Sequence, residues 1–376
     1  MAPAPDVIVI GAGLVGTMTA LGLAEAGVRV TLIESHFPGG GSTGAAMGHI
    51  VAMDDSAQQL SLCAHSRERW HQLVASLPES GEHDRCGTLW IAADDAELAA
   101  ARARIPAYAS HNVAAELVDQ RGLYQLEPRL RPGLAGGLLV PDDAVCYPPA
   151  ITRDLAERAT RLGVIVRLRA HVESLAPGGV LLAETGPIEA GAVVVAAGVA
   201  SPQLVPGLPI VPRKGHLVIT DRRPGLVRHQ LVELGYLRSA HTFGAASIAF
   251  NVQPRRTGQV LIGSSRELVG FDASINHELL GTMLERAAAF LPELHSARAL
   301  RSWIGFRPAT PDKLPLIGRW PALDNVWIAA GHEGLGITMA TGTADIIVAG
   351  ILGTNAPVNP EPFRPDRAMP GLARAA

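Results

Sequence analysis

The chain has 376 residues, of which 48% are hydrophobic, and this length and content favour two domains over one. Its 32 Lys and Arg residues against 35 Asp and Glu give a net charge of −3, without the basic patch of a nucleic-acid-binding protein. Cys63, Cys86 and Cys146 lie too far apart for a disulfide framework, an iron–sulfur site or a zinc site, so we predict no metal.

The first predicted unit is a strand, a glycine turn and a helix. Residues 6–10 are apolar after an initial Asp, and helical spacing of apolar residues follows the turn. A second apolar strand, residues 28–33, ends at Glu34 and Ser35, where a carboxylate can accept both hydroxyls of an adenosine ribose. This pattern predicts a dinucleotide site whose phosphates lie at the helix N-terminus. The turn itself consists of Gly11, Ala12, Gly13, Leu14, Val15 and Gly16.

Further along the chain lie a second loop of small residues and several helices and strands. Residues 39–48 (GGGSTGAAMG) contain only small, hydroxyl and Met side chains, and His49 follows them directly. Helices are predicted at residues 57–75 and 149–162, and a strand at 169–175 contains Val172. Residues 190–198 (AGAVVVAAG) combine a buried strand with a turn at Ala197 and Gly198.

The middle of the chain predicts a largely antiparallel sheet. Strands are expected at residues 88–92 and 134–140, and the segments 235–241, 247–255 and 261–266 are expected to be adjacent strands that cover a pocket.

Two polar segments and a long apolar helix follow. Residues 305–318 (GFRPATPDKLPLIG) contain Arg307, and residues 325–330 form a strand that turns sharply into a helix. The stretch 334–353 has a bilayer's length but holds five glycines and Asp345, so we expect a buried core helix. The tail, residues 355–376, has no periodic apolar face and is expected to trail off the fold or to contact a partner.

Together these segments resemble the amino-acid oxidase superfamily of FAD-dependent flavoproteins, over residues 6 to 353. The resemblance implies that residues 39–48 wrap the FAD and that the turn before the last helix points at the flavin ring. No cysteine or attachment motif lies near that turn, so non-covalent FAD is expected. Flavin hydroxylases typically carry Gly-Asp at Gly331-His332, which disfavours a monooxygenase. The implied FAD contacts are Ser42, Thr43, Ala46, Met47, Gly48, Val172, Ala197, Gly198, Gly331, His332, Gly334, Leu335, Gly336, Ile337 and Thr338.

The same resemblance implies a substrate site for a small amino acid or secondary amine. Residues 305–318 resemble the segment of D-amino-acid, glycine and sarcosine-type enzymes whose arginine, here Arg307, grips the substrate carboxylate. His49 and His332 are candidate pocket residues. Simple glycine oxidases carry a carboxylate-binding tyrosine where this chain has Asn251, so Tyr236 or Asn251 is expected to assist Arg307.

Closer resemblance links the chain to the catalytic subunits of D-hydroxyproline, opine and hydrogen-cyanide-forming glycine dehydrogenases, through AFNVQPR, LIGSSRE and GHEGLGIT. It implies electron-transfer partner subunits in a hetero-oligomer. Neither Lys214 nor Lys313 lies on the strand where sarcosine oxidases hold the cation that speeds reaction with oxygen, so we favour a non-oxygen acceptor. A peroxide-producing oxidase and a flavin-holding subunit that is inactive without partners are the alternatives.

The fold class expected from these elements is α/β, with a Rossmann-like FAD domain and an inserted α+β substrate domain built on a mostly antiparallel sheet. The FAD domain is expected at residues 1–85, 145–205 and 308–353, and the substrate domain at 86–144 and 206–307. The tail would start at residue 354. No charged leader precedes the first apolar run, which favours the cytoplasm, at the inner-membrane surface if the acceptor lies there.

Overall fold

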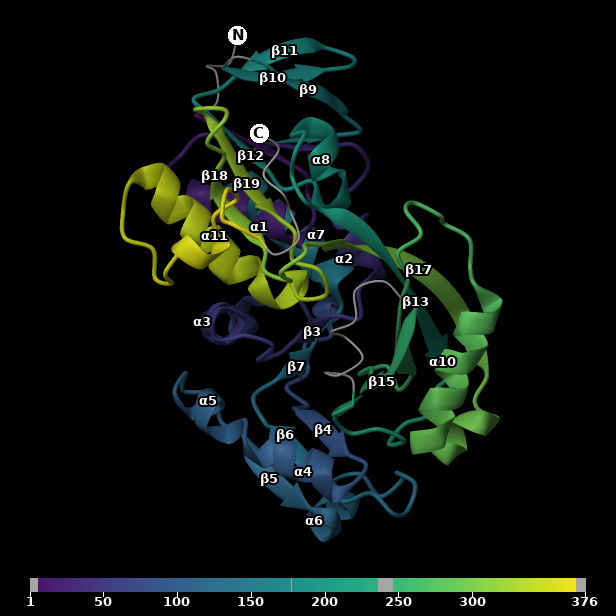
Figure 1. Cartoon of the computed structure of the whole chain (residues 1–376). Coiled ribbons are helices and arrows are strands. Elements are labelled where there is room, and N and C mark those ends of the chain that lie inside the picture. Colours follow the sequence, from purple (N-terminus) through teal and green to yellow (C-terminus); the bar gives the residue numbers. More distant parts are fainter. Residues whose placement is uncertain (1–5, 177, 236–245, 370–376) are drawn as a thin grey trace.

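The computed structural model describes residues 6–176, 178–235 and 246–369, which build two large sheets joined by several crossings of the chain (Figure 1). The first sheet has a parallel centre and one antiparallel edge strand, as the predicted Rossmann-like unit requires. In spatial order its strands are β18 (Leu316–Arg319), β19 (Val326–Ala330), β12 (Ala192–Val195), β1 (Val7–Ile10), β2 (Val30–Glu34) and β8 (Ile165–Leu168).

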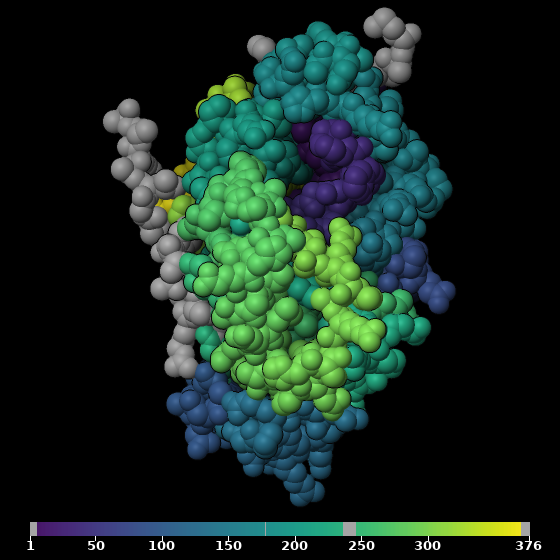
Figure 2. All heavy atoms as spheres, turned by 90° about the vertical axis from the view of Figure 1, so that its right-hand side faces the viewer, coloured from purple at the N-terminus to yellow at the C-terminus, as the bar shows by residue number. Residues whose placement is uncertain are grey.

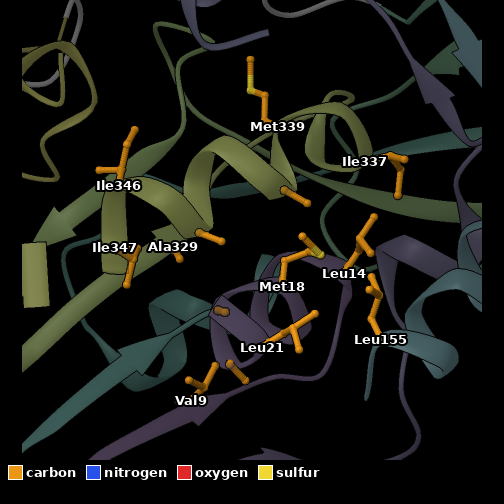
Figure 3. Close-up of a cluster of buried hydrophobic side chains, with 14 of the residues drawn as sticks. Val9, Leu14, Met18, Leu21, Leu155, Ala329, Ile337, Met339, Ile346 and Ile347 are labelled. Atoms are coloured by element: carbon orange, nitrogen blue, oxygen red, sulfur yellow. The ribbon is translucent and has the colours of Figure 1, made fainter. Parts of the chain in front are cut away.

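Both faces of this sheet are covered. The residues of β1 are all apolar and buried, and successive ones point to opposite sides. Val7 and Val9 pack in the core of a helical layer, where Figure 3 shows Val9 together with Leu21, whereas Ile8 and Ile10 pack in the core beside a small three-stranded sheet. The helices are α1 (Leu14–Glu25), α3 (Ala57–Leu73), α7 (Pro148–Arg161) and α11 (Gly336–Leu352). The small sheet consists of β9 (Val172–Ala176), β10 (Gly179–Leu182) and β11 (Gly186–Glu189).

The stretch that resembled a membrane span in length is the core helix α11. It packs against α1 and α3, and 11 of its residues are buried. In the described residues no helix is both long and apolar enough to span a bilayer.

The second sheet has eight strands and is antiparallel except where β14 pairs with β4. Helix α10 (His277–Phe290) packs on one face, where the rings of Phe250 and Phe290 stack with centroids 4.4 Å apart. The short helices α4 (Asp95–Arg102), α5 (Ile105–Ala109) and α6 (Gln120–Leu126) lie at its far end (Figure 1). The strands, in spatial order, are β17 (Ala299–Ala309), β13 (Val211–Thr220), β16 (Val260–Arg266), β15 (Ser247–Pro254), β14 (Gln230–Glu233), β4 (Thr88–Ala92), β6 (Gly136–Val140) and β5 (Glu116–Asp119).

Short elements connect the two sheets. The two-stranded pair β3 (His49–Ile50) and β7 (Ala144–Val145), with the one-turn helix α2 (Ser42–Ala45), lies where the chain passes between them. The remaining short elements are α8 (Ser201–Leu204) and the 3₁₀ turns η1 (Val74–Ser76), η2 (Glu79–Gly81), η3 (Gly198–Ala200), η4 (Pro292–Ser296) and η5 (Glu361–Phe363).

The expectation that the tail trails off the fold is wrong for residues 355–369. Val358, Phe363 and Met369 are buried, and the Arg367 guanidinium binds both carboxylate oxygens of Asp312, at 2.7 and 2.9 Å. These apolar residues have no helical or strand spacing, because they enter the core from an irregular chain, Val358 and Phe363 on the helical side of the sheet and Met369 on the other.

Candidate active site

A cavity of about 580 Å³ lies where the two sheets meet. One end is lined by residues of β1, β2 and α1, and the other by residues of β13, β15, β16 and β17. Figure 2 shows purple N-terminal segments recessed between the teal and green parts of the chain. The cavity therefore joins the predicted nucleotide turn to the predicted substrate sheet.

The glycine turn forms the narrow end of the cavity. Gly11, Gly13, Leu14 and Val15 line it, and so do Glu34 and Ser35. A Cβ on Gly11, which has φ +100°, would lie 2.5 Å from the carbonyl oxygen of Ala196, so the turn needs glycine there. Gly13, the N-cap residue of α1, makes no side-chain cap, and the N-terminus of this helix can receive an anion.

Ala12 and Gly16 do not line the cavity but hold its shape. The Ala12 N–H donates to Glu34 Oε2 at 2.8 Å. A Cβ on Gly16 would lie 1.9 Å from the Gly11 carbonyl oxygen, so the absence of a side chain lets α1 pack against the turn.

The loop of residues 39–48 bridges α1 and the second sheet. Thr43 Oγ1 accepts from the Leu14 N–H at 3.0 Å, and the Ser42 hydroxyl donates to the Phe306 carbonyl at 2.6 Å. The Met47 carbonyl accepts from Gln253 Nε2 at 2.6 Å. All five residues predicted from this loop line the cavity, namely Ser42, Thr43, Ala46, Met47 and Gly48.

The return strand and the small sheet complete the nucleotide end. Ala197 and Gly198 line the cavity after β12. Val172 lines it as the first residue of β9, which starts later than predicted because Arg169 has φ +55°.

The N-terminus of α11 faces the wide end of the cavity. No side chain caps this helix, so its first N–H groups and its dipole can stabilise negative charge on a ligand. Gly331 and Thr338 lie outside the lining, and the Thr338 hydroxyl instead donates to the His49 carbonyl at 3.1 Å. The predicted residues that do line the cavity here are His332, Gly334, Leu335, Gly336 and Ile337.

Arg307 reaches the wide end from β17, and its Nη1 donates to the Ser265 carbonyl at 3.0 Å. A Cβ on Gly215 would lie 2.2 Å from this Nη1, so a glycine on the neighbouring strand makes room for the guanidinium. Asn251 lines the same end from β15, and Tyr236 lies outside the described residues.

Two histidines in this wall, His49 and His332, are neutral near pH 7. Burial, followed by the charge of Arg307, lowers the pKa of His49 to about 4. Burial lowers the pKa of His332 to about 3, and its Nε2 lies 2.9 Å from Thr343 Oγ1. Each can therefore take part in hydrogen bonds without adding a positive charge.

Four charged residues that the sequence did not single out as site residues also line the wide end. They are Asp55, Arg266, Lys313 and Glu333. Lys313 lies in the turn after β17, off any strand, yet its side chain reaches the cavity wall. Arg266 and Lys313 lie inside segments that carry the family resemblance, but no local sequence pattern predicts that their side chains line the cavity.

These features fit FAD. Gly11 and Gly48 form a cradle that a Cβ would fill, Glu34 offers a carboxylate for a ribose, and two uncapped helix N-termini face one cavity. The fold and the cavity together define a dinucleotide-binding flavoprotein with a substrate site beside the flavin end.

Comparison with known proteins assigns the family. The model of the DAO family, FAD dependent oxidoreductases, matches residues 6–349, and the chain belongs to this family. The enzyme is an FAD-dependent oxidoreductase.

Curated relatives with different names match most of the chain. Glycine oxidase of Pseudomonas aeruginosa is 27% identical over 96% of this chain and 98% of its own length. D-amino acid dehydrogenase of Xanthobacter autotrophicus is 30% identical over 81% of this chain and 72% of its own length. The bifunctional protein ThiO/ThiG of Trichormus variabilis is 30% identical over 91% of this chain, which spans 52% of that protein.

Solved structures confirm the predicted fold class. Glycine oxidase from Geobacillus kaustophilus superposes with a TM-score of 0.87 at 24% identity, covering 97% of this chain and 99% of that one. L-proline dehydrogenase from P. horikoshii gives a TM-score of 0.87 at 25% identity, covering 97% and 98%.

Proposed function

We propose that the enzyme oxidises the carbon–nitrogen bond of a small amino acid, or of a secondary amine that carries a carboxylate. The observation that carries this proposal is the position of Arg307. Its guanidinium lies in the wide end of the cavity, and its Cδ lies 3.9 Å from where a Cβ of Gly334 would be, beside the N-terminus of α11. A carboxylate bound there would be next to the flavin end of the cofactor.

The chain's contribution to this reaction is positioning. Arg307 offers two parallel N–H donors to the substrate carboxylate and so fixes which carbon faces the flavin. Neutral His49 and the Asn251 amide are polar groups that can hydrogen-bond the amine. FAD, when bound, supplies the chemistry by accepting a hydride from Cα at its N5. Water then hydrolyses the imine that the substrate has become.

For the final acceptor we propose a carrier other than oxygen, a quinone or a partner subunit, which would place the enzyme at the cytoplasmic face of the inner membrane. Lys313 in the cavity wall favours the alternative, an oxidase, because a cation near the flavin would stabilise charge that develops on oxygen. The names of the relatives include both an oxidase and a dehydrogenase, so they do not distinguish oxygen from another electron acceptor. The remaining alternative is a flavin-holding subunit that is inactive without partner chains.

An anaerobic absorbance titration of the purified holoenzyme tests the proposal. Glycine, sarcosine, D-alanine, D-proline, cis-4-hydroxy-D-proline and an opine are added in turn, and we expect one class to bleach the flavin bands. Rapid stoichiometric peroxide under air would establish the oxidase. A flavin that no amine reduces would contradict amine oxidation by this chain alone.

A further inference from the structure

The part of the cavity wall that carries Arg307 also carries a second arginine. Arg266 is the last residue of β16, is only 4% exposed, and lines the cavity. Arg307 Nη1 donates to the carbonyl of Ser265, the residue before Arg266, so the Arg307 guanidinium lies beside the strand that carries Arg266. Guanidinium groups stay protonated in proteins, so both are positive.

The charges around them leave this end of the cavity positive. Glu333 forms an ion pair with Arg213 at 2.6 Å, and Asp55 is the other carboxylate in the wall at this end. Against these two carboxylates stand four cationic side chains, those of Arg213, Arg266, Arg307 and Lys313. The residues that the structure does not describe contain no Asp or Glu that could add to these two carboxylates.

Buried acceptor atoms in the same wall lack a hydrogen-bond partner among the described residues. Asn251 is 5% exposed and its Oδ1 has none, nor does Oδ1 of Asp55. A buried polar atom left without a partner costs about 1–3 kcal/mol, so such atoms in a cavity wall indicate a polar ligand. Unpartnered acceptors fit a ligand with an N–H donor, and the cationic side chains of the same wall fit a ligand with carboxylates.

We propose that the substrate is an amine with two carboxylates, of which Arg307 holds the one next to the reacting carbon and Arg266, with Lys313, holds the other. This inference rests on the proposed function and adds the substrate class. The bond changes stay the same: a hydride leaves Cα for FAD, the amine nitrogen loses a proton, and a C=N bond forms. Water cleaves that bond to a carbonyl acid and an amine, and the acceptor reoxidises the flavin.

The first test compares matched substrates on the unaltered holoenzyme. Iminodiacetate differs from sarcosine by one carboxylate, and D-glutamate differs from D-2-aminobutyrate in the same way. We expect the dicarboxylate of at least one pair to reduce the flavin with a Kd about 10- to 100-fold lower than its partner, as for a charged hydrogen-bond pair. The iminodiacetate pair tests a secondary amine and the glutamate pair a primary amine.

Equal Kd values within both pairs would overturn the second-carboxylate inference and leave amine oxidation standing. If no amine reduced the flavin, the proposed function itself would fail, and this inference with it. The two failures are therefore distinct.

The second test removes the cation. Arg266→Gln should weaken binding of the dicarboxylate about 10- to 100-fold and leave the monocarboxylate within about threefold, with FAD content unchanged. Arg256→Gln, in the exposed turn between β15 and β16, is the control and should change neither Kd. Equal weakening of both substrates in Arg266→Gln would show a structural role and overturn the inference. Should that variant not fold, Arg266→Lys keeps the charge, and the comparison of unaltered substrate pairs still decides.

Discussion

At the scale of single residues, burial is the main factor that sets the charge state of the two histidines in the cavity wall. His49 and His332 lie in the wall with pKa values of about 4 and 3, so they remain uncharged where the arginines do not. The positive charge of the wall therefore comes from the arginines and Lys313, which can bind carboxylates. The lowered pKa values of the histidines also make the stability of the fold depend on pH.

His332 gives a prediction about that dependence. Between pH 6.5 and about 3 the unfolded chain binds a proton at this residue that the folded chain does not, so its contribution to stability is complete above pH 6.5 and is lost as the pH falls. From pH 7 to pH 5 the loss is about 2 kcal/mol. Thermal unfolding of His332→Gln should show a shallower loss over this range. Exposed His295→Gln is the control, and parallel curves for all three proteins would contradict the assignment.

Arg307 gives a prediction about binding. Arg307→Lys keeps one positive charge but cannot make two parallel hydrogen bonds, so we expect KM for the amine to rise about 10- to 100-fold with FAD content unchanged. Steady-state kinetics and flavin absorbance measure both quantities. Arg301→Lys, at an exposed position of the same strand, should behave as the unaltered enzyme. Unchanged kinetics in Arg307→Lys would remove this residue from the substrate site.

At the scale of elements, glycines decide how closely the connecting loops approach one another. Gly48 has φ +97°, and a Cβ there would lie 2.1 Å from the Cys146 carbonyl oxygen, directly before β3. The loop that lines the cavity can therefore meet β7 only through a glycine.

Gly48→Ala should lower the free energy of unfolding by about 2 kcal/mol or more and release FAD, because the left-handed conformation and the contact both oppose a methyl group. Urea unfolding and the flavin content of the purified protein are the measurements. Gly281→Ala is the matched control within α10, where the added Cβ meets nothing, and it should stabilise by about 1 kcal/mol. A Gly48→Ala protein that kept FAD and stability would contradict the close approach.

The elements that could be predicted from the sequence are those whose pattern lies within one short, continuous segment. The strand, glycine turn and helix around Gly11, and the turn into α11, each have their own local pattern. Arg266 and Lys313 could not be placed, because their meeting with Arg307 depends on how β13, β16 and β17 pair and on a turn with Lys313 at φ +63°. Long-range register of this kind leaves no mark in a short segment.

At the scale of the whole molecule, the C-terminal segment packs on the FAD-binding part and holds the turn after β17. Arg367 binds Asp312 and the carbonyls of Leu314 and Pro315, in the turn that also presents Lys313 to the cavity. Phe363 is 1% exposed in the same core as α1 and α11. The segment is thus part of the fold that shapes the site.

Phe363→Ala should lower the free energy of unfolding by about 3 kcal/mol, the usual result of emptying a buried aromatic site. Phe271→Ala, where the ring is 55% exposed, should change it by less than about 1 kcal/mol. Chemical unfolding of the two holoenzymes gives the comparison, and equal losses would show that the tail does not pack as described.

The strand order of the first sheet also has a consequence for how the protein is made. β1 is synthesised first and lies near the centre of the sheet, but its neighbour β12 begins at Ala192 and the next strand, β19, begins at Val326. A ribosome must therefore release most of the chain before this sheet can close, and the nascent N-terminal strand stays without one partner meanwhile. Premature termination anywhere before residue 330 leaves no smaller unit with a complete nucleotide site.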